Sequence, residues 1–226
     1  GLIQITKTGA YIYDVEPSPQ NSAASFRVGT FDGPYLQNPI NGTTFTEVYG
    51  EETKIALFLD YEWQFFKKLG KLGIKAGSGI MYAQGAGIFG AQTYYNDGTS
   101  IQDAIEANET YNLFVFPNNI ALIYRMQLWD KQWLVPFAEI GLDYLALIEY
   151  RDDGEETNFG GAPHFHFALG GSFLLNALSR DIGLTVDKEY GINAMWLTAE
   201  YRRLELITGD FDFSDDVFSA GFMFEF

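Results

Sequence analysis

The chain contains no cysteine, which leaves it without disulfide bonds or thiolate metal ligands. It has only two histidines, and its 14 lysines and arginines are outnumbered by 30 acidic residues, giving a net charge of −16. This shortage of positive charge argues against nucleic-acid binding, because proteins that bind phosphate backbones need a basic surface. No run of 18 apolar residues occurs, so the sequence predicts no transmembrane helix.

Aromatic residues are abundant instead. The 226 residues include 20 Phe, 14 Tyr and 4 Trp, and 47% of the chain is hydrophobic. That hydrophobic content excludes a disordered acidic protein. Together with 24 glycines, it is typical of a β-rich fold.

The strongest pattern covers residues 53–65, where apolar and polar side chains alternate over about 13 residues. Strands of soluble proteins usually have about 5–6 residues, whereas a strand that crosses a membrane needs roughly 9–11. The length of this segment therefore favours a membrane-spanning strand.

The same alternation predicts seven further strands, within residues 24–30, 72–82, 120–128, 138–144, 164–170, 195–202 and 218–226. Eight is an even number, as bacterial outer-membrane barrels require. We therefore predict an all-β fold, an eight-stranded antiparallel up-and-down transmembrane β-barrel over residues 22–226. Residues 1–21 are expected to form an N-terminal periplasmic segment or a plug.

The predicted connections alternate in length. Short turns lie near residues 67–71 and 130–133, and long extracellular loops are expected at 32–52, 84–116, 149–162 and 204–216. The long loops contain 18 of the 30 acidic residues and a single basic residue, Arg151. One short amphipathic periplasmic helix is predicted from the spacing of Leu174, Leu175, Leu178 and Ile182. This arrangement places both termini in the periplasm of a Gram-negative bacterium, with the barrel integral to the outer membrane.

Alternation alone is also compatible with a soluble lipocalin-like barrel, whose apolar face points inward. Long strands and aromatic residues near the strand ends favour the membrane. The predicted lipid-facing wall comprises Ile55, Leu57, Leu59, Tyr61, Trp63, Phe65, Phe165, Phe167, Phe222, Phe224 and Phe226. The predicted lumen charge network comprises Arg27, Lys54, Asp60, Glu62, Lys75, Arg125, Glu139, Asp143, His164, His166, Glu200 and Arg202, with Glu225 also facing inward. Eight strands leave room only for side chains, so we expect paired charges to close the lumen and not a wide porin channel.

Several stretches resemble the small outer-membrane β-barrel family of myxobacteria and Bdellovibrio. They are FRVGTFDGPY (26–35), FTEVYG (45–50), IYR (123–125), VPFAEIGLDY (135–144), DKEYGI (187–192), EYR (200–202) and the C-terminal residues 213–226. The resemblance covers most of the chain from about residue 23. It implies an outer-membrane barrel and no catalytic residues. The terminal aromatic strand also looks like the signal read by barrel-assembly machinery.

Three motifs suggest other chemistry, and each has a simpler interpretation. Residues 85–90 match GxGxxG, but a dinucleotide site also needs a helix that opens at this loop. His164 and His166 share a face and would need Glu139 or Asp143 to complete a metal site, so membership of the lumen network is favoured. The acidic runs 152–156 and 210–216 could hold Ca²⁺, but they lack EF-hand spacing and are typical of a solvated surface.

Residues Leu113, Phe114, Val115 and Phe116 are apolar on both faces, which suggests contact with lipid or with another copy of the chain. The sequence thus predicts a non-enzymatic outer-membrane protein with a structural, lipid-contacting role and no cofactor or metal. Its expected partners are outer-membrane lipids, the barrel-assembly machinery and further copies of itself, and no nucleic acid. The alternatives are a small channel and an adhesin that acts through its acidic loops.

Overall fold

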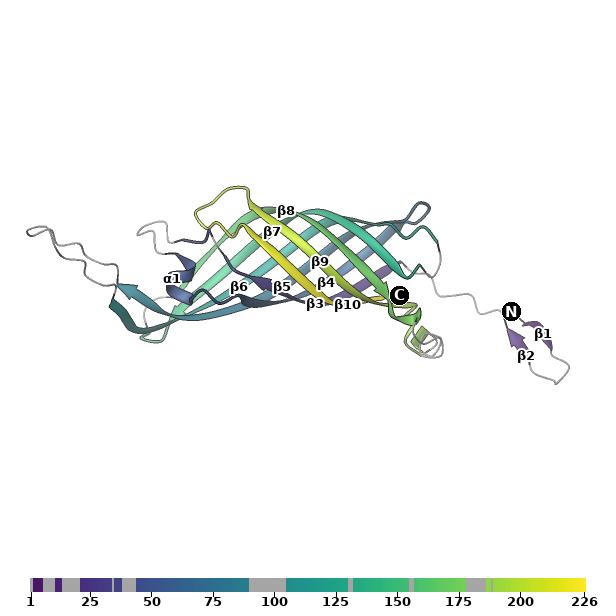
Figure 1. Ribbon diagram of the computed structural model, residues 1–226, viewed down its shortest axis with the longest axis horizontal. Coiled ribbons are helices and arrows are strands. Elements are labelled where there is room, and N and C mark those ends of the chain that lie inside the picture. Colours follow the sequence, from purple (N-terminus) through teal and green to yellow (C-terminus); the bar gives the residue numbers. More distant parts are fainter. Residues whose placement is uncertain are drawn as a thin grey trace, which may run out of the picture.

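The computed structural model describes residues 2–5, 11–13, 21–33, 35–37, 44–89, 105–129, 132–154, 157–177, 186–187 and 189–226. Its main body is a closed antiparallel barrel (Figure 1). The barrel strands are β3 (Ser22–Phe31), β4 (Lys54–Phe66), β5 (Lys71–Phe89), β6 (Ile105–Arg125), β7 (Leu134–Arg151), β8 (Asn158–Leu174), β9 (Ala194–Leu206) and β10 (Asp215–Glu225).

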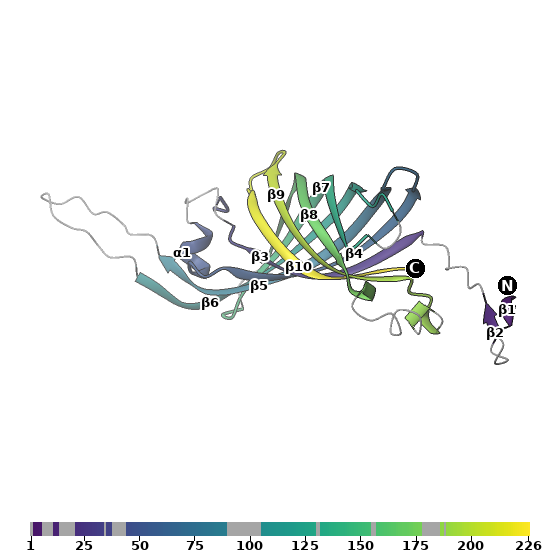
Figure 2. The same ribbon diagram turned by 45° about the vertical axis from the view of Figure 1, so that its right-hand side comes forward.

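Each strand pairs with its sequence neighbour, and β10 closes the barrel against β3 through the register Phe222↔Phe26. The predicted fold class is therefore confirmed. The first residue of β3 and the C-terminal residue Phe226 lie at one end, where the Ser22 amide donates to the Phe226 carbonyl (3.0 Å). We call this the turn end, and the opposite end, which carries helix α1 (Phe45–Tyr49), the loop end (Figures 1 and 2).

A separate two-stranded hairpin precedes the barrel. It pairs β1 (Leu2–Ile5) with β2 (Tyr11–Tyr13). Figure 1 draws it beyond the turn end. Whether residues 1–21 serve as a tail or as a plug stays a prediction.

Two of the predicted loops are largely strand. The expected loop 84–116 is taken up by β5 as far as Phe89 and by β6 from Ile105, and residues 90–104 lie outside the described part. The expected loop 149–162 shrinks to residues 152–157, because β7 and β8 continue through it. Backbone hydrogen bonds propagate a ladder irrespective of side-chain type, so the hydrophobic pattern ends before the strand does.

The predicted periplasmic helix is corrected as well. Leu174 is the last residue of β8, and Leu175 begins a three-residue 3₁₀ turn that ends at Ala177. Leu178 and Ile182 lie outside the described residues, and helical conformation is found instead at 186, 187, 189 and 190. Among the residues that the structure describes, no helix reaches the length and hydrophobicity of a membrane span.

Helix α1 was not predicted, although its start is encoded locally. The Thr44 hydroxyl accepts from the Glu47 amide, and the Glu47 carboxylate accepts from the Thr44 amide, a reciprocal capping box. The Glu47 carboxylate accepts from both the amide and the hydroxyl of Thr44, and these two hydrogen bonds lower the pKa of Glu47. The helix packs against the part of β5 that extends beyond β4, because Gly85 has no side chain. A Cβ there would lie 1.8 Å from the carbonyl oxygen of Val48.

This packing also explains the role of the GxGxxG motif. Its residues 85–89 belong to β5, which continues as a strand where a dinucleotide fold would open a helix, and Gly90 lies outside the described part. The dinucleotide interpretation is therefore wrong, and Gly85 serves close packing.

Candidate functional site

The interior of the barrel contains a central charge cluster built from Arg27, Asp60, Lys75, Glu139, Asp143, His166, Glu200 and Arg202, all buried. Arg27 on β3 lies 2.9 Å from Asp60 on β4 and 2.5 Å from Glu200 on β9. Arg202 on β9 lies 3.0 Å from Glu200 and 3.3 Å from Glu139 on β7. The contacts of Arg27 with Glu200 and of Arg202 with Glu139 link strands that are not neighbours in the sheet.

Lys75 and His166 complete the cluster. The Lys75 ammonium contacts Glu139 and lies 3.5 Å from Glu200. The His166 ring faces a carboxylate at each nitrogen, since Nε2 lies 3.0 Å from Glu139 Oε1 and Nδ1 contacts Asp143. A neutral imidazole donates from only one nitrogen, so with both carboxylates ionised the ring is doubly protonated. The charged ring balances the cluster, with Arg27, Lys75, Arg202 and His166 facing the four carboxylates.

A second group of paired charges lies toward the turn end. Arg125 donates through Nε (2.9 Å) and Nη2 (2.7 Å) to Glu62, and its guanidinium lies 4.9 Å from the ring centre of Phe137. Lys71 Nζ lies 2.7 Å from Glu225. Gln64 joins the two pairs by donating to Glu62 (3.2 Å) and Glu225 (3.0 Å).

The predicted network omitted three side chains of this group. Gln64 already lies on the polar face of the predicted strand 53–65, and Lys71 continues the inward alternation one step before the predicted strand 72–82, so the strand pattern could have included both. Trp196 donates from its indole nitrogen to Glu225 (3.1 Å) and is 2% exposed. Parity places Trp196 on the same face as Glu200 and Arg202, but an aromatic side chain gives no reason to expect it in a charge cluster.

Lys54 does not belong to the network, contrary to the prediction. It is the half-buried first residue of β4 at the loop end, where its ammonium donates to the carbonyl of Tyr49 (2.6 Å). The reason is its position: the apolar residues Ala56 and Phe58 follow it on the inward face and separate it from Asp60.

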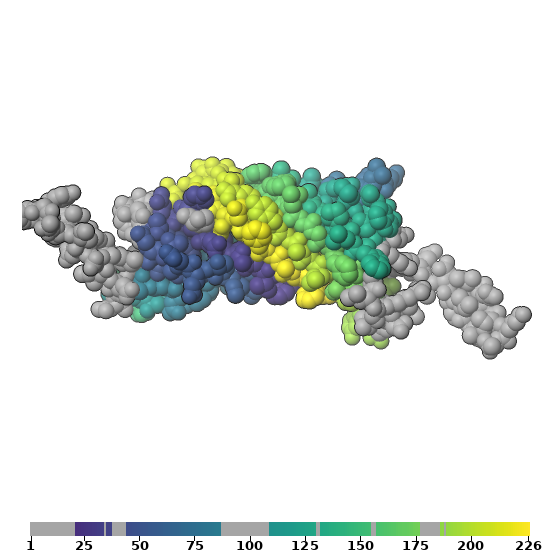
Figure 3. All heavy atoms as spheres, in the orientation of Figure 1, coloured from purple at the N-terminus to yellow at the C-terminus, as the bar shows by residue number. Residues whose placement is uncertain are grey.

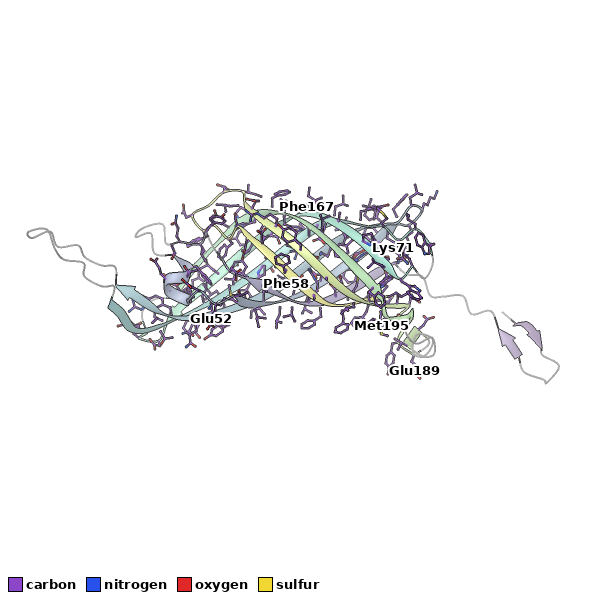
Figure 4. All side chains as sticks on the ribbon, viewed as in Figure 1. Glu52, Phe58, Lys71, Phe167, Glu189 and Met195 are labelled. Carbon is purple, nitrogen blue, oxygen red and sulfur yellow. The ribbon has the colours of Figure 1, made fainter. Side chains whose placement is uncertain are left out.

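The loop-end half of the lumen is apolar. Phe58 lies among the inward side chains, and Phe167 lies on the outer surface of the barrel (Figure 4). The buried cluster around Phe58 includes Met81, Leu113, Val115, Leu145, Leu147, Leu204 and Val217. Leu113 and Val115 are 2% and 1% exposed, so the expectation that they contact lipid or another copy is wrong. Their inward positions in β6 face this cluster.

A chain of aromatic rings spans the mouth above this cluster. Phe213 lies between His164 (5.9 Å between ring centres) and Phe31 (6.1 Å), and Phe31 meets Phe45 of α1 (6.5 Å). Phe45 packs against Tyr49 with their rings tilted (5.0 Å between ring centres). We call His164, Phe213, Phe31, Phe45 and Tyr49 the aromatic lid.

Polar contacts fasten the lid at its edges. The Tyr49 hydroxyl donates to Glu149 of β7 (2.6 Å), and burial together with this carboxylate raises the pKa of the phenol. Asp215 accepts from the amides of Asp32 (2.7 Å) and Gly33 (3.0 Å), which holds the end of β3 to β10. Below the lid, a cavity of about 20 Å³ lies between the apolar side chains and the pair Asp143 and Arg202, room for about one water molecule.

The histidines do not converge on a metal. His164 contacts the Ala162 carbonyl through Nδ1 (3.1 Å) and accepts from the Phe213 amide at Nε2 (3.0 Å), while His166 is held by Glu139 and Asp143. The acidic runs are similarly engaged: Asp152 accepts from the Thr110 amide. Within the described ranges, no group of three or more histidine or carboxylate side chains is arranged to hold a metal ion.

The exterior is apolar. Every residue of the predicted lipid-facing wall lies on it, all exposed except half-buried Phe224. Exposure reaches 65% for Ile55 and 64% for Leu59 on β4. The space-filling view shows the strands as a continuous wall, with β9 and β10 crossing it diagonally (Figure 3). Phe114 also faces outward, stacked between Phe116 (6.4 Å) and Tyr150 (6.3 Å).

Comparisons with known proteins find similar folds but little sequence identity. No family model matches the chain, and no curated protein matches it. Among solved structures it is similar to the N-terminal β-barrel domain of Pseudomonas aeruginosa OprF, with 10% identity, a TM-score of 0.43, and 92% of this chain and 98% of that chain covered. Neisserial surface protein A gives 11% identity, a TM-score of 0.45 and coverage of 91% and 96%.

The outer membrane protease OmpT from Escherichia coli is similar to the same degree. It gives 9% identity, a TM-score of 0.42 and coverage of 94% and 99%. At these values the chain shares no established family with these proteins. The chain is thus an eight-stranded up-and-down β-barrel, and its function has to be inferred from its own residues.

Proposed function

We propose that the protein is a non-enzymatic integral outer-membrane barrel with a structural, lipid-contacting role in the cell envelope. The observation that carries this proposal is the distribution of side chains: charged side chains are buried inside the barrel, and large apolar side chains cover its outside. A soluble carrier barrel has the opposite arrangement, with an apolar interior around its ligand and a polar exterior.

Strand length and aromatic placement support the same environment. The strands β5 to β8 have between 17 and 21 residues, more than the roughly 9–11 that a tilted membrane strand needs. Aromatic side chains gather near the strand ends: Tyr61, Trp63 and Phe65 toward the turn end, and Tyr82, Phe114 and Tyr150 toward the loop end. Such girdles sit at the two lipid–water interfaces of membrane barrels.

The filled interior favours a structural role over a channel. The aromatic lid, the loop-end apolar cluster and the two charge groups follow one another along the lumen, and the charges pair across it. Desolvated ion pairs of this kind resist separation, since breaking one leaves a buried charge without a partner. The proposal includes both termini in the periplasm, assembly directed by the C-terminal aromatic strand, and kinship with the small myxobacterial and Bdellovibrio barrels.

Placing a charge on the outer wall tests the proposal. Leu59→Arg on β4 is expected to lower the free energy of unfolding in lipid vesicles by about 2–4 kcal/mol, because arginine is costly in the hydrocarbon region of a barrel exterior. Urea-induced unfolding in vesicles measures this change.

The matched control is Glu51→Arg, at an exposed site in the loop between α1 and β4, with an expected change within about 0.5 kcal/mol. If Leu59→Arg also changed the free energy by no more than this, the wall would face water and the membrane proposal would fail.

Self-association is a further part of the proposal. Phe114 and Phe116 form an outward aromatic patch with Tyr82, whose ring centre lies 4.9 Å from that of Phe114. Flat apolar surface of this kind offers contact to a second barrel as well as to lipid. Chemical crosslinking in native membranes should yield dimers, and Phe114→Ala should reduce their amount. If only monomer is found at every crosslinker dose, the self-association proposal is wrong.

A further inference from the structure

Within the aromatic lid, the backbone of Phe213 is held by a hydrogen bond to a titratable side chain. The connection 207–214 between β9 and β10 turns inward, so that Phe213 is 0% exposed. Its backbone amide donates to His164 Nε2 (3.0 Å), and the other ring nitrogen, Nδ1, contacts the carbonyl of Ala162 (3.1 Å). Because a carbonyl only accepts, Nδ1 carries the proton and Nε2 the lone pair. His164 is therefore neutral when the lid is closed.

Protonation of His164 is incompatible with this contact. A second proton on Nε2 turns the acceptor into a donor that points at the N–H of Phe213, and a backbone amide cannot accept in its place. Rotation of the ring does not help, since both nitrogens of the imidazolium are donors. The amide of Phe213 must move away, and its ring leaves the contacts with His164 and Phe31.

We propose that His164 is a proton-operated latch: protonation of its ring releases Phe213 and opens the aromatic lid at the loop end. Histidine changes charge close to neutral pH, which suits this role. The latch acts first on the lid, because the His164 ring bonds the Phe213 amide and the Ala162 carbonyl and not the carboxylates of the central charge cluster.

Burial opposes a positive charge on the His164 ring while the lid is closed, and two nearby carboxylates act in the opposite direction. Asp143 is its partner across β7 and β8, and Asp212 interacts with it from the connection 207–214. His166 is two residues along β8, and Arg202 on β9 lines the cavity below the lid. The two carboxylates stabilise a positive ring in an otherwise apolar site, whereas His166 and Arg202 already share Asp143.

Opening of the lid exposes the small cavity below Phe213 and does not open a pore through the barrel. The walls below Phe213 are Phe58, Met81, Val115, Leu145, Leu204 and Val217, and the floor is formed by Asp143 and Arg202. The lid also keeps its second anchor, because Tyr49 and Glu149 hold α1 independently of Phe213. Acid should therefore loosen the connection 207–214 while the barrel stays intact.

Amide hydrogen exchange by NMR tests the latch in the full chain in lipid nanodiscs, between pH 8 and pH 4.5. The protection factor of the Phe213 amide, which corrects for the intrinsic pH dependence of exchange, should fall by about tenfold for each pH unit below the His164 transition. The Ile140 amide, in the middle of β7, should keep its protection and reports that the barrel remains folded.

Two variants separate the histidine from the nearby acids. His164→Gln keeps an amide oxygen that accepts from Phe213 but does not titrate, so protection should stay constant over the range. His164→Lys offers only donors, and protection should be low at every pH. The proposal is overturned if wild-type protection does not change, or if His164→Gln loses protection as the wild type does, which would assign the transition to Asp143 or Asp212.

Discussion

Replacing Glu139 with glutamine is expected to lower the free energy of unfolding by about 3–5 kcal/mol. Its carboxylate contacts Lys75, lies 3.0 Å from His166 and 3.3 Å from Arg202, and its side chain is 0% exposed. Glutamine preserves the shape but removes the charge, so the positive groups of the central cluster outnumber the remaining carboxylates. Urea titration in lipid vesicles, followed by the loss of native β-structure, measures the change.

Glu52→Gln is the matched control, since Glu52 is exposed at the loop end (Figure 4). Its replacement should change the free energy by no more than about 0.5 kcal/mol. A loss below about 1 kcal/mol for Glu139→Gln would mean that water reaches the cluster and screens it, and the sealed lumen would have to be abandoned.

The pair formed by Arg125 and Glu62 gives the second large effect. Arg125→Leu removes the guanidinium from the Glu62 carboxylate, which is 2% exposed and keeps a hydrogen bond from Gln64, and should cost about 3–5 kcal/mol. Replacing both residues with leucine removes the stranded charge. The double variant should recover most of the loss, because an apolar pair of similar volume is often as stable as a buried ion pair.

A double-mutant cycle from vesicle unfolding measures the coupling between the two positions. We expect the loss in the double variant to be smaller than in either single variant. Purely additive losses would show that each side chain acts alone, for example through the contact of Arg125 with the Phe137 ring. The Ala76→Leu variant on the outer wall of β5 serves as a control for added apolar volume.

Much of the fold could be predicted because a strand that separates lipid from a packed lumen must alternate at every step. Ile55 and Asp60 on β4 illustrate this, being assigned to opposite faces by parity alone, and they lie there. The same parity placed Arg27, Glu139 and His166 on the inner face. Parity assigned Lys54 to the correct face but not to the correct position. Alternation does not encode the distance along the lumen, so it could not show that Lys54 lies away from the charge cluster.

Partners across the lumen could not be predicted. Arg27 pairs with Glu200, 173 positions away in the chain, only because β10 closes against β3 and brings β9 near. The aromatic lid was missed for a related reason. Phe213 belongs to an acidic run that is typical of a solvated surface, and only the turn of the connection 207–214 into the barrel buries its ring.

The sequence by itself determined the inside and the outside of this barrel, since burial of each side chain follows a local period of two. Tertiary structure alone decided which buried groups meet. The apolar run from Leu113 to Phe116 shows both: parity sends Leu113 and Val115 inward, but whether they meet charges or aromatic rings depends on their height along the lumen. That height is set by strand register and barrel closure, which depend on contacts between residues far apart in the chain.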